Sequence, residues 1–150
     1  MDLTGNSFFS IRFANIMRFE SSPYKDQFSF VKKEFPFGVF YLCDSFYISE
    51  VHEGIHFDWD CAHQLADLLE EFYGKDAKVG WISNRLNSYS IDPQSWVKFH
   101  ENYDFLYAGA IVSYNDVNYI NATLEKRFSK IKIKRCHSLE QALDWITNFK

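Results

Sequence analysis

The sequence predicts an α/β domain in which helices cover a mostly parallel, mixed β-sheet. Two observations lead to this fold class. Short apolar runs rich in β-branched and aromatic residues alternate with segments whose apolar residues recur at helical spacing. The runs at 77–83 and 106–114 are apolar on both faces, which is typical of the central strands of a parallel sheet. The expected order of elements is ββαβαβαβα, with an antiparallel hairpin at its N-terminal end.

The hairpin and the first helix are expected within residues 39–74. Residues 39–43 and 46–51 are two apolar runs with high strand propensity, and Asp44-Ser45 between them predicts a turn. Asp58 is suited to cap the helix that follows, and Gly74 is suited to end it. The buried stripe of this helix is expected to hold Cys61, Leu65, Leu68, Leu69 and Phe72.

Two further helices follow the central strands. Asp92 as N-cap and Pro93 at the first helical position predict the start of one of them, which carries Trp96, Phe99 and Tyr103. The other begins at Asn115 or Asp116. Its apolar residues recur at helical spacing, so we expect a side formed by Val117, Ile120, Leu124 and Phe128 to face inward.

The C-terminal part is expected to add an edge strand and a last helix. Residues 131–134 alternate between isoleucine and lysine, as an edge strand with one solvated face does. Ser138 and Gln141 stand three residues apart and form a capping box. The inner side of the helix that they open is expected to hold Leu139, Ala142, Leu143, Ile146 and Phe149.

Residues 1–30 do not fit this order of elements. Their apolar residues fall on alternate positions, which is the period of a strand, before Ser21-Ser22-Pro23 breaks the pattern. We expect an N-terminal extension, either an added edge strand or a weakly ordered tail, ahead of an α/β domain that spans residues 31–150. A third interpretation places the natural start of the chain at Met17. The alternating residues are Phe9, Ile11, Phe13, Met17 and Phe19.

Composition and charge exclude several classes of protein. The net charge of −4 argues against a domain that coats nucleic acid. No apolar run approaches the ~18 residues of a membrane span, and the N-terminus lacks the pattern of a signal peptide, so we expect a cytoplasmic protein that is not integral to a membrane. Cys43, Cys61 and Cys136 are odd in number and far apart, which predicts reduced thiols and neither a disulfide framework nor a thiolate metal site.

Basic residues gather in one stretch of the otherwise acidic chain. Six lysines and arginines lie between Lys126 and Arg135. The simpler interpretation is an edge strand that lysines protect from pairing with other chains. The alternative is a patch for a partner or for anionic lipid.

The stretch His52-Glu53-Gly54-Ile55-His56 matches the H-E-x-x-H pattern of zinc peptidases. That chemistry requires both histidines on one face of a helix, whereas this stretch follows a strand and contains a glycine. We therefore interpret it as a strand end and a turn with exposed histidines. The chain also lacks the glycine-rich motifs of nucleotide sites. We expect no metal and no cofactor, and we identify no catalytic residues.

A polar loop between the central strand and the helix at Asp92-Pro93 is the candidate binding or regulatory site. Loops at strand ends carry polar groups that packed layers do not accommodate. Hydroxyl and amide groups ahead of a helix N-terminus favour an anion such as a phosphoryl group, although the same residues are also normal turn and cap chemistry. The candidate residues are Ser83, Asn84, Arg85, Asn87, Ser88 and Ser90.

Residues 37–149 resemble the STAS fold, and specifically the SpoIIAA-like or STAS/SEC14 group of bacterial proteins of largely unassigned function. Three stretches carry the resemblance: PFGVFYLCDSFYISEVHEGIHFDWD, WISNRLNSYSIDPQSW and AIVSYNDVNYINATLEKRFSKIKIKRCHSLEQALDW. The resemblance implies a regulatory or ligand-binding domain that is not an enzyme. In anti-sigma-factor antagonists of this fold a partner kinase phosphorylates a serine or threonine after the third strand. The matching position here lies around Ser88 to Ser90, where the chain has Ser-Tyr-Ser-Ile-Asp-Pro in place of the D-[ST]-[ST]-G-like signature.

Two functional hypotheses follow, and a third stays open. The first is a module that binds a protein partner through the polar loop, with a possible serine phosphoswitch. The second is a domain of SEC14 type for a small apolar ligand or lipid, which the high aromatic content of 19% favours. A closed apolar cavity of ~300 Å³ or more would support the second hypothesis. An enzyme would require convergent titratable groups in one cleft.

Overall fold

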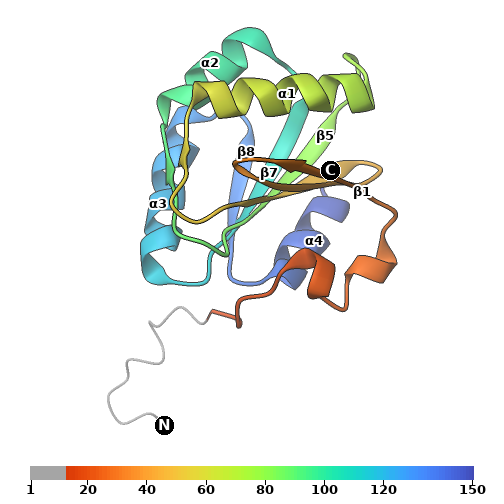
Figure 1. The fold of residues 1–150 in the computed structure, drawn as a ribbon, viewed down its shortest axis with the longest axis vertical. Coiled ribbons are helices and arrows are strands. Elements are labelled where there is room, and N and C mark those ends of the chain that lie inside the picture. The colour runs from red at the N-terminus through yellow and green to blue at the C-terminus, as the bar shows by residue number, and fades with distance from the viewer. Residues whose placement is uncertain (1–12) are drawn as a thin grey trace, which may run out of the picture.

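The computed structural model describes residues 13–150, which fold around one six-stranded sheet (Figure 1). The strands lie in the order β1-β2-β3-β5-β7-β8. The first three are antiparallel, and β5, β7 and β8 continue the sheet in parallel from β3. The expected mixed sheet, led by an antiparallel hairpin, is therefore confirmed. The strands are β1 (Val31–Phe35), β2 (Gly38–Leu42), β3 (Phe46–Val51), β5 (Val79–Asn84), β7 (Leu106–Val112) and β8 (Lys132–Cys136).

Four helices cover the two faces of this sheet. They are α1 (Trp59–Tyr73), α2 (Gln94–Asn102), α3 (Asp116–Phe128) and α4 (Leu139–Thr147). Side chains of α1, α2 and α3 belong to one hydrophobic cluster and those of α4 to the other, so three helices lie on one face and one lies on the opposite face (Figure 1). No helix within residues 13–150 is both long enough and apolar enough to cross a membrane.

The expected helix caps are present. The side chains of Asp58, Asn115 and Ser138 accept hydrogen bonds from backbone N–H groups of α1, α3 and α4. Gly74 follows α1 with a φ of 96°, a conformation that a residue with a Cβ rarely adopts. Only α2 starts one residue later than expected, because Pro93 occupies the N-cap position while Asp92 Oδ1 accepts from the N–H of Gln94.

Three short strands were not expected from the sequence. β1 has the sequence VKKEF and pairs with β2 at the edge of the sheet, where its charged side chains face solvent. β4 (His56–Phe57) and β6 (Ser90–Ile91) each have two residues and pair in parallel as a separate ladder. A strand of two residues is too short to show the alternation of apolar and polar side chains that predicts a strand. The pairing of β4 with β6 therefore depends on the loops around them.

The expected inner face of α3 is wrong. Val117, Ile120, Leu124 and Phe128 are 68%, 63%, 47% and 37% exposed, and Ala122 and Glu125 are buried in their place. Hydrophobic spacing alone would place the four large side chains against the sheet. The helix presents its other side because Glu125 on that side pairs with the buried Arg85, which directly follows the inner strand β5.

Residues 13–30 form no strand, and they are not loosely attached. They contain two short 3₁₀ turns, η2 (Phe19–Ser21) and η3 (Lys25–Gln27). The Phe19 side chain is fully buried, its ring packs 5.1 Å from that of Tyr41, and its N–H donates to Glu50 Oε2 at 2.8 Å. Residues 13–30 thus pack on the domain as turns, and the expectation for the N-terminal extension of residues 1–30 stays a prediction. Phe9 and Ile11 of the alternating pattern lie outside the described residues.

We expect Phe19→Ala to lower the free energy of unfolding by about 3–5 kcal/mol, because it leaves a cavity in a closed part of the core. Ile16→Ala is the matched control, since Ile16 is 64% exposed and surface changes of this kind stay within about 0.5 kcal/mol. Urea unfolding of both variants provides the measurement. Equal stability of the two variants would show that residues 13–30 contribute nothing to the core.

Candidate functional site

The structure divides the six candidate loop residues into a buried and an exposed group. Ser83 and Asn84 belong to β5, and together with Arg85 they are at most 5% exposed. Asn87 is half-buried, and its amide donates to Val51 O at 3.0 Å. Only Ser88 and Ser90 are exposed. The six residues therefore do not form one polar surface loop, because the first two of them, Ser83 and Asn84, still belong to β5.

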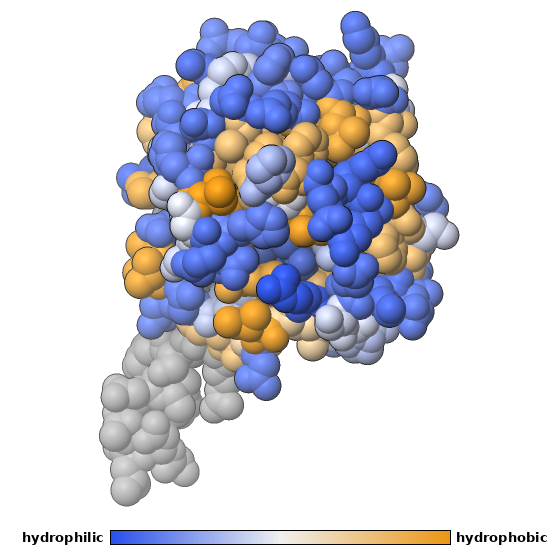
Figure 2. Space-filling view, viewed as in Figure 1, coloured by the Kyte–Doolittle hydropathy of each residue, from blue (hydrophilic) through white to orange (hydrophobic). Residues whose placement is uncertain are grey.

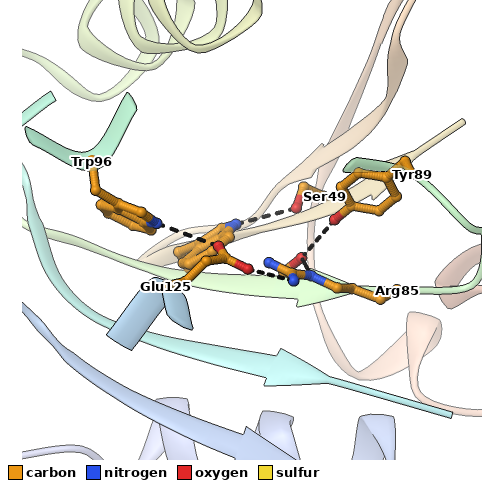
Figure 3. A network of polar contacts seen from close by, with 7 residues as sticks. Ser49, Arg85, Tyr89, Trp96 and Glu125 are labelled. Carbon is orange, nitrogen blue, oxygen red and sulfur yellow. Dashed lines mark hydrogen bonds and ion pairs between the residues drawn. The ribbon is translucent and has the colours of Figure 1, made fainter. Parts of the chain in front are cut away.

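Arg85 is the centre of a buried polar network on the α1–α3 side of the sheet (Figure 3). Its Nη1 lies 2.5 Å from Glu125 Oε2, and its Nε donates to Ser83 Oγ at 3.0 Å. The Tyr89 hydroxyl is 3.2 Å from the same Ser83 oxygen. Trp96 Nε1 donates to the second oxygen of Glu125 at 3.3 Å. The network therefore joins the end of β5, the loop after it, α2 and α3.

Arg85 stays a cation although it is buried beside Glu125. Burial disfavours the cation of Arg85, but the Glu125 carboxylate outweighs that effect and raises the pKa of Arg85 above its ordinary value. Burial also raises the pKa of Tyr89, so its phenol stays neutral. Arg85 Nη2 has no hydrogen-bond partner among the described residues. Both N–H groups of this nitrogen thus lack an acceptor among residues 13–150.

The Asn84 side chain lies on the opposite face of the sheet from those of Ser83 and Arg85. This follows from its place between them, because successive side chains of a strand point to opposite faces. Its amide donates to Glu50 Oε2 at 2.8 Å and to Met17 O at 2.9 Å, and its carbonyl oxygen accepts from the Tyr114 hydroxyl at 2.7 Å. Burial raises the pKa of Glu50, while the donors from Phe19 and Asn84 oppose that shift. Asn84 therefore anchors the N-terminal segment and does not contribute to a surface site.

A cavity of about 80 Å³ lies between the sheet and helices α1 and α2. Its wall is mostly apolar, with Trp81, Leu65 and Phe99 among the lining side chains. Glu125 and Ser95 also line it, and the buried hydroxyl of Ser95 has no hydrogen-bond partner within residues 13–150. The cavity is well below the ~300 Å³ that we set for a lipid carrier. It has room for a small group or a few water molecules.

The β4–β6 ladder covers this region and fixes the two exposed serines. The N–H of Ser90 donates to Ile55 O at 2.9 Å, and the N–H of Gly54 donates to Ser88 O at 2.7 Å. Ser90 Oγ lies 2.7 Å from His56 Nδ1, and the N–H of Ser88 donates to Glu53 Oε1 at 3.1 Å. Sequence reasoning missed the contact between Ser90 and His56, because the two residues are 34 positions apart.

The stretch 52–56 does not form a helix. His52 follows β3, Gly54 adopts a φ of 78° in a turn, and His56 lies in β4. Both histidines are exposed, as expected for a strand end and turn. Among residues 13–150, no group of three or more histidine, cysteine, aspartate or glutamate side chains is placed to hold a metal ion.

The three cysteines are free thiols. Burial raises the pKa of Cys43 and that of Cys136 to about 12, so both thiols are protonated at neutral pH. Cys61 is half-buried near the start of α1.

The basic stretch ends in the edge strand expected for it. β8 pairs only with β7 within the described sheet, and Lys132 faces solvent. Arg135 is engaged within the protein: its guanidinium lies 4.2 Å from the centroid of the Tyr119 ring and donates to Thr123 Oγ1 at 2.7 Å.

Comparison with known proteins identifies the fold. No family model matches the sequence, and no curated protein matches it. An uncharacterized protein of the DUF3478 family from Shewanella loihica, with a SpoIIAA-like fold, superposes with a TM-score of 0.51 at 11% identity. The match covers 79% of this chain and 92% of that protein. The chain therefore has a SpoIIAA-like fold, as its resemblance to the STAS fold implies.

We expect Glu125→Gln to lower the free energy of unfolding by about 3–5 kcal/mol, because it leaves the Arg85 cation buried without a counter-charge. Replacing both partners, as Arg85→Met with Glu125→Leu, is the control. It removes both charges, so most of the lost stability should return. Chemical unfolding of Arg85→Met, Glu125→Leu and the double variant forms the cycle, and additive losses would contradict the coupling.

Proposed function

Because the chain has a SpoIIAA-like fold, we propose that it is a regulatory module that binds a protein partner without catalysing a reaction. The contact surface in this proposal is the ladder surface, formed by His52, Glu53, Gly54, His56, Ser88 and Ser90, all of which are exposed. One observation carries the proposal: two serines stand exposed on a hydrogen-bonded ladder beyond the ends of the central strands, directly before α2.

The ladder surface suits a partner because it is ordered before binding. Backbone hydrogen bonds join its two segments at Gly54, Ser90 and Asp92, so little conformational entropy remains to be lost. Below it, Phe57 and Ile91 line the cavity and tie the ladder to the core. A loop held in this way presents its polar groups in one arrangement.

Ser90 is the better of the two serines for a phosphoswitch. A phosphate on Ser90 would add about −2 charge beside His56 Nδ1, which can donate to it, and near the positive end of α2. A phosphate on Ser88 would meet the Glu53 carboxylate, which accepts from the Ser88 N–H. We therefore assign the switch to Ser90 and a contact role to Ser88.

The contact between Ser90 and His56 resembles a nucleophile with its base, yet a third group is missing. Within residues 13–150, no carboxylate hydrogen-bonds to His56, so nothing orients the ring as a catalytic triad requires. Neither residue lines the cavity. These two facts support a binding role for the pair.

The test is partner capture with the wild-type chain and with Ser90→Asp. The introduced charge meets a partner surface built for a neutral serine, and burying an unpaired charge costs several kcal/mol, so we expect loss of binding by at least about a hundredfold. Lys98→Asp is the matched control, because Lys98 is exposed on α2 and is not part of the ladder surface.

Quantitative mass spectrometry of the captured proteins compares the three baits. Proteins retained by the wild type and by the Lys98 variant but lost with the Ser90 variant support the proposal. If the same proteins bind equally to all three baits, the ladder surface is not the contact. Circular dichroism of each variant confirms that its fold is intact.

The cavity favours a second candidate function, the binding of a small molecule. Ligand pockets usually measure roughly 300–1,000 Å³, so about 80 Å³ does not accommodate a lipid of SEC14 type. A small aromatic or aliphatic molecule with one hydroxyl would pair with the free hydroxyl of Ser95 and fill the apolar end.

We expect phenol at millimolar concentration to shift the amide signals of residues around the cavity in an ¹H–¹⁵N spectrum. Ala66 lines the cavity, so Ala66→Leu should fill it and abolish the shifts, whereas Lys98→Asp should leave them unchanged. Absence of shifts in the wild type, or identical shifts in the Ala66 variant, would remove this candidate.

A further inference from the structure

Helix α3 carries an apolar stripe on its outer side. We call Val117, Ile120, Leu124 and Phe128 the α3 stripe; these side chains are between 37% and 68% exposed. They follow one another at intervals of three or four residues, so they lie on one face of the helix. With 13 residues, α3 is about 20 Å long, and the stripe runs along most of it.

The helix cannot bury this stripe by turning about its axis. Its inner side is fixed by Glu125, which pairs with Arg85 and accepts from Trp96. Rotation would break that contact and leave a charge unpaired in the core. Figure 2 shows hydrophobic side chains at the left margin of the molecule, over α3, among the blue of polar residues. A continuous exposed apolar face of this kind marks an interaction surface.

The charges along α3 identify an occupant. Asp116 lies in its first turn, Lys126 and Arg127 lie in its last turn, and all three are exposed. Among the ion pairs of residues 13–150, none includes these three side chains. An antiparallel copy of α3 would bring the acidic end of each helix to the basic end of the other. It would also oppose the two helix dipoles.

The stripe is complementary to itself in the same arrangement. When two copies of α3 lie antiparallel about an axis at the level of Ala122, Val117 of one copy faces Phe128 of the other, and Ile120 faces Leu124. Apolar side chains then face apolar side chains along the contact. A two-fold axis of this kind uses one patch twice, as the commonest dimers do.

We propose that two copies of the chain associate through the α3 stripe as an antiparallel, two-fold symmetric dimer. The stripe shares no residue with the ladder surface, so this interaction is separate from the proposed function. Each dimer presents two ladder surfaces. A partner that carries two matching sites would bind with the added strength of a bivalent contact.

Sedimentation equilibrium of the full chain tests the association. We expect a dimer whose dissociation constant rises at least about a hundredfold in Leu124→Glu, because the new carboxylate would be buried against apolar side chains. Val97→Glu is the matched control: Val97 is 41% exposed on α2, outside the stripe, and its replacement should leave the dimer unchanged.

A wild type that stays monomeric up to roughly 100 µM would overturn the proposal and leave residues 1–12 or another protein to cover the stripe. A dimer that Leu124→Glu leaves unchanged would also overturn it. Because Lys98→Asp and Ser90→Asp do not alter the stripe, failure of the ladder surface in partner capture is distinguishable from failure of the dimer.

Cysteine cross-linking tests the orientation of the helices. Cys61→Ser removes the half-buried native thiol, while Cys43 and Cys136 are buried. In this background, a mixture of Val117→Cys and Phe128→Cys chains should form a disulfide-linked dimer under mild oxidation, and neither variant alone should do so. Cross-linking of Val117→Cys with itself would show a parallel pair and would overturn the antiparallel arrangement.

Discussion

Arg85 and Glu125 come from different parts of the chain, and their ion pair decides how those parts face each other. Arg85 follows β5 directly, so its guanidinium enters the space between the sheet and the helices. Glu125 is the residue of α3 that reaches it, at 2.5 Å. The pair sets the rotation of α3 about its axis and places the loop after β5 through Ser83 and Tyr89. A buried pair of this kind adds little net stability, and its contribution here is orientation.

The order of strands and helices could be predicted from the sequence because its signals are local. Apolar runs gave the central strands, and Asp58, Asn115 and Ser138 marked the helix starts that their hydrogen bonds confirm. The orientation of α3 was predicted wrongly, since its apolar spacing indicates a buried face and the four side chains are exposed. The missing information was long-range: a carboxylate in α3 had to meet a cation 40 positions earlier. The one feature of the sequence that pointed to this contact was a lone arginine, Arg85, directly after an apolar strand.

The structural positions of the six candidate residues could be predicted from the sequence only in part, and their role as a site stays a prediction. The six residues lie at the end of β5 and in the segment after it, yet strand alternation sends Ser83 and Arg85 to one face and Asn84 to the other. Ser83, Asn84 and Arg85 are therefore buried, and their hydrogen bonds connect the hydrophobic layers on the two faces of the sheet. The exposed serines depend on a two-residue ladder that no periodicity reveals, and the neighbour of Ser90 is a histidine from a stretch that the sequence pattern associates with metal.

The packing of residues 13–30 has a consequence for synthesis on the ribosome. Ala14 N–H donates to His137 O at 3.1 Å, and the Tyr24 hydroxyl donates to Glu140, 116 residues later in the chain. The surface that receives this early segment is therefore completed only when α4 has left the exit tunnel. Phe19 belongs to a hydrophobic cluster that α4 helps to close, so part of that cluster stays uncovered in the nascent chain until α4 emerges. The segment that is translated early therefore completes its contacts only with residues around the last of the described helices.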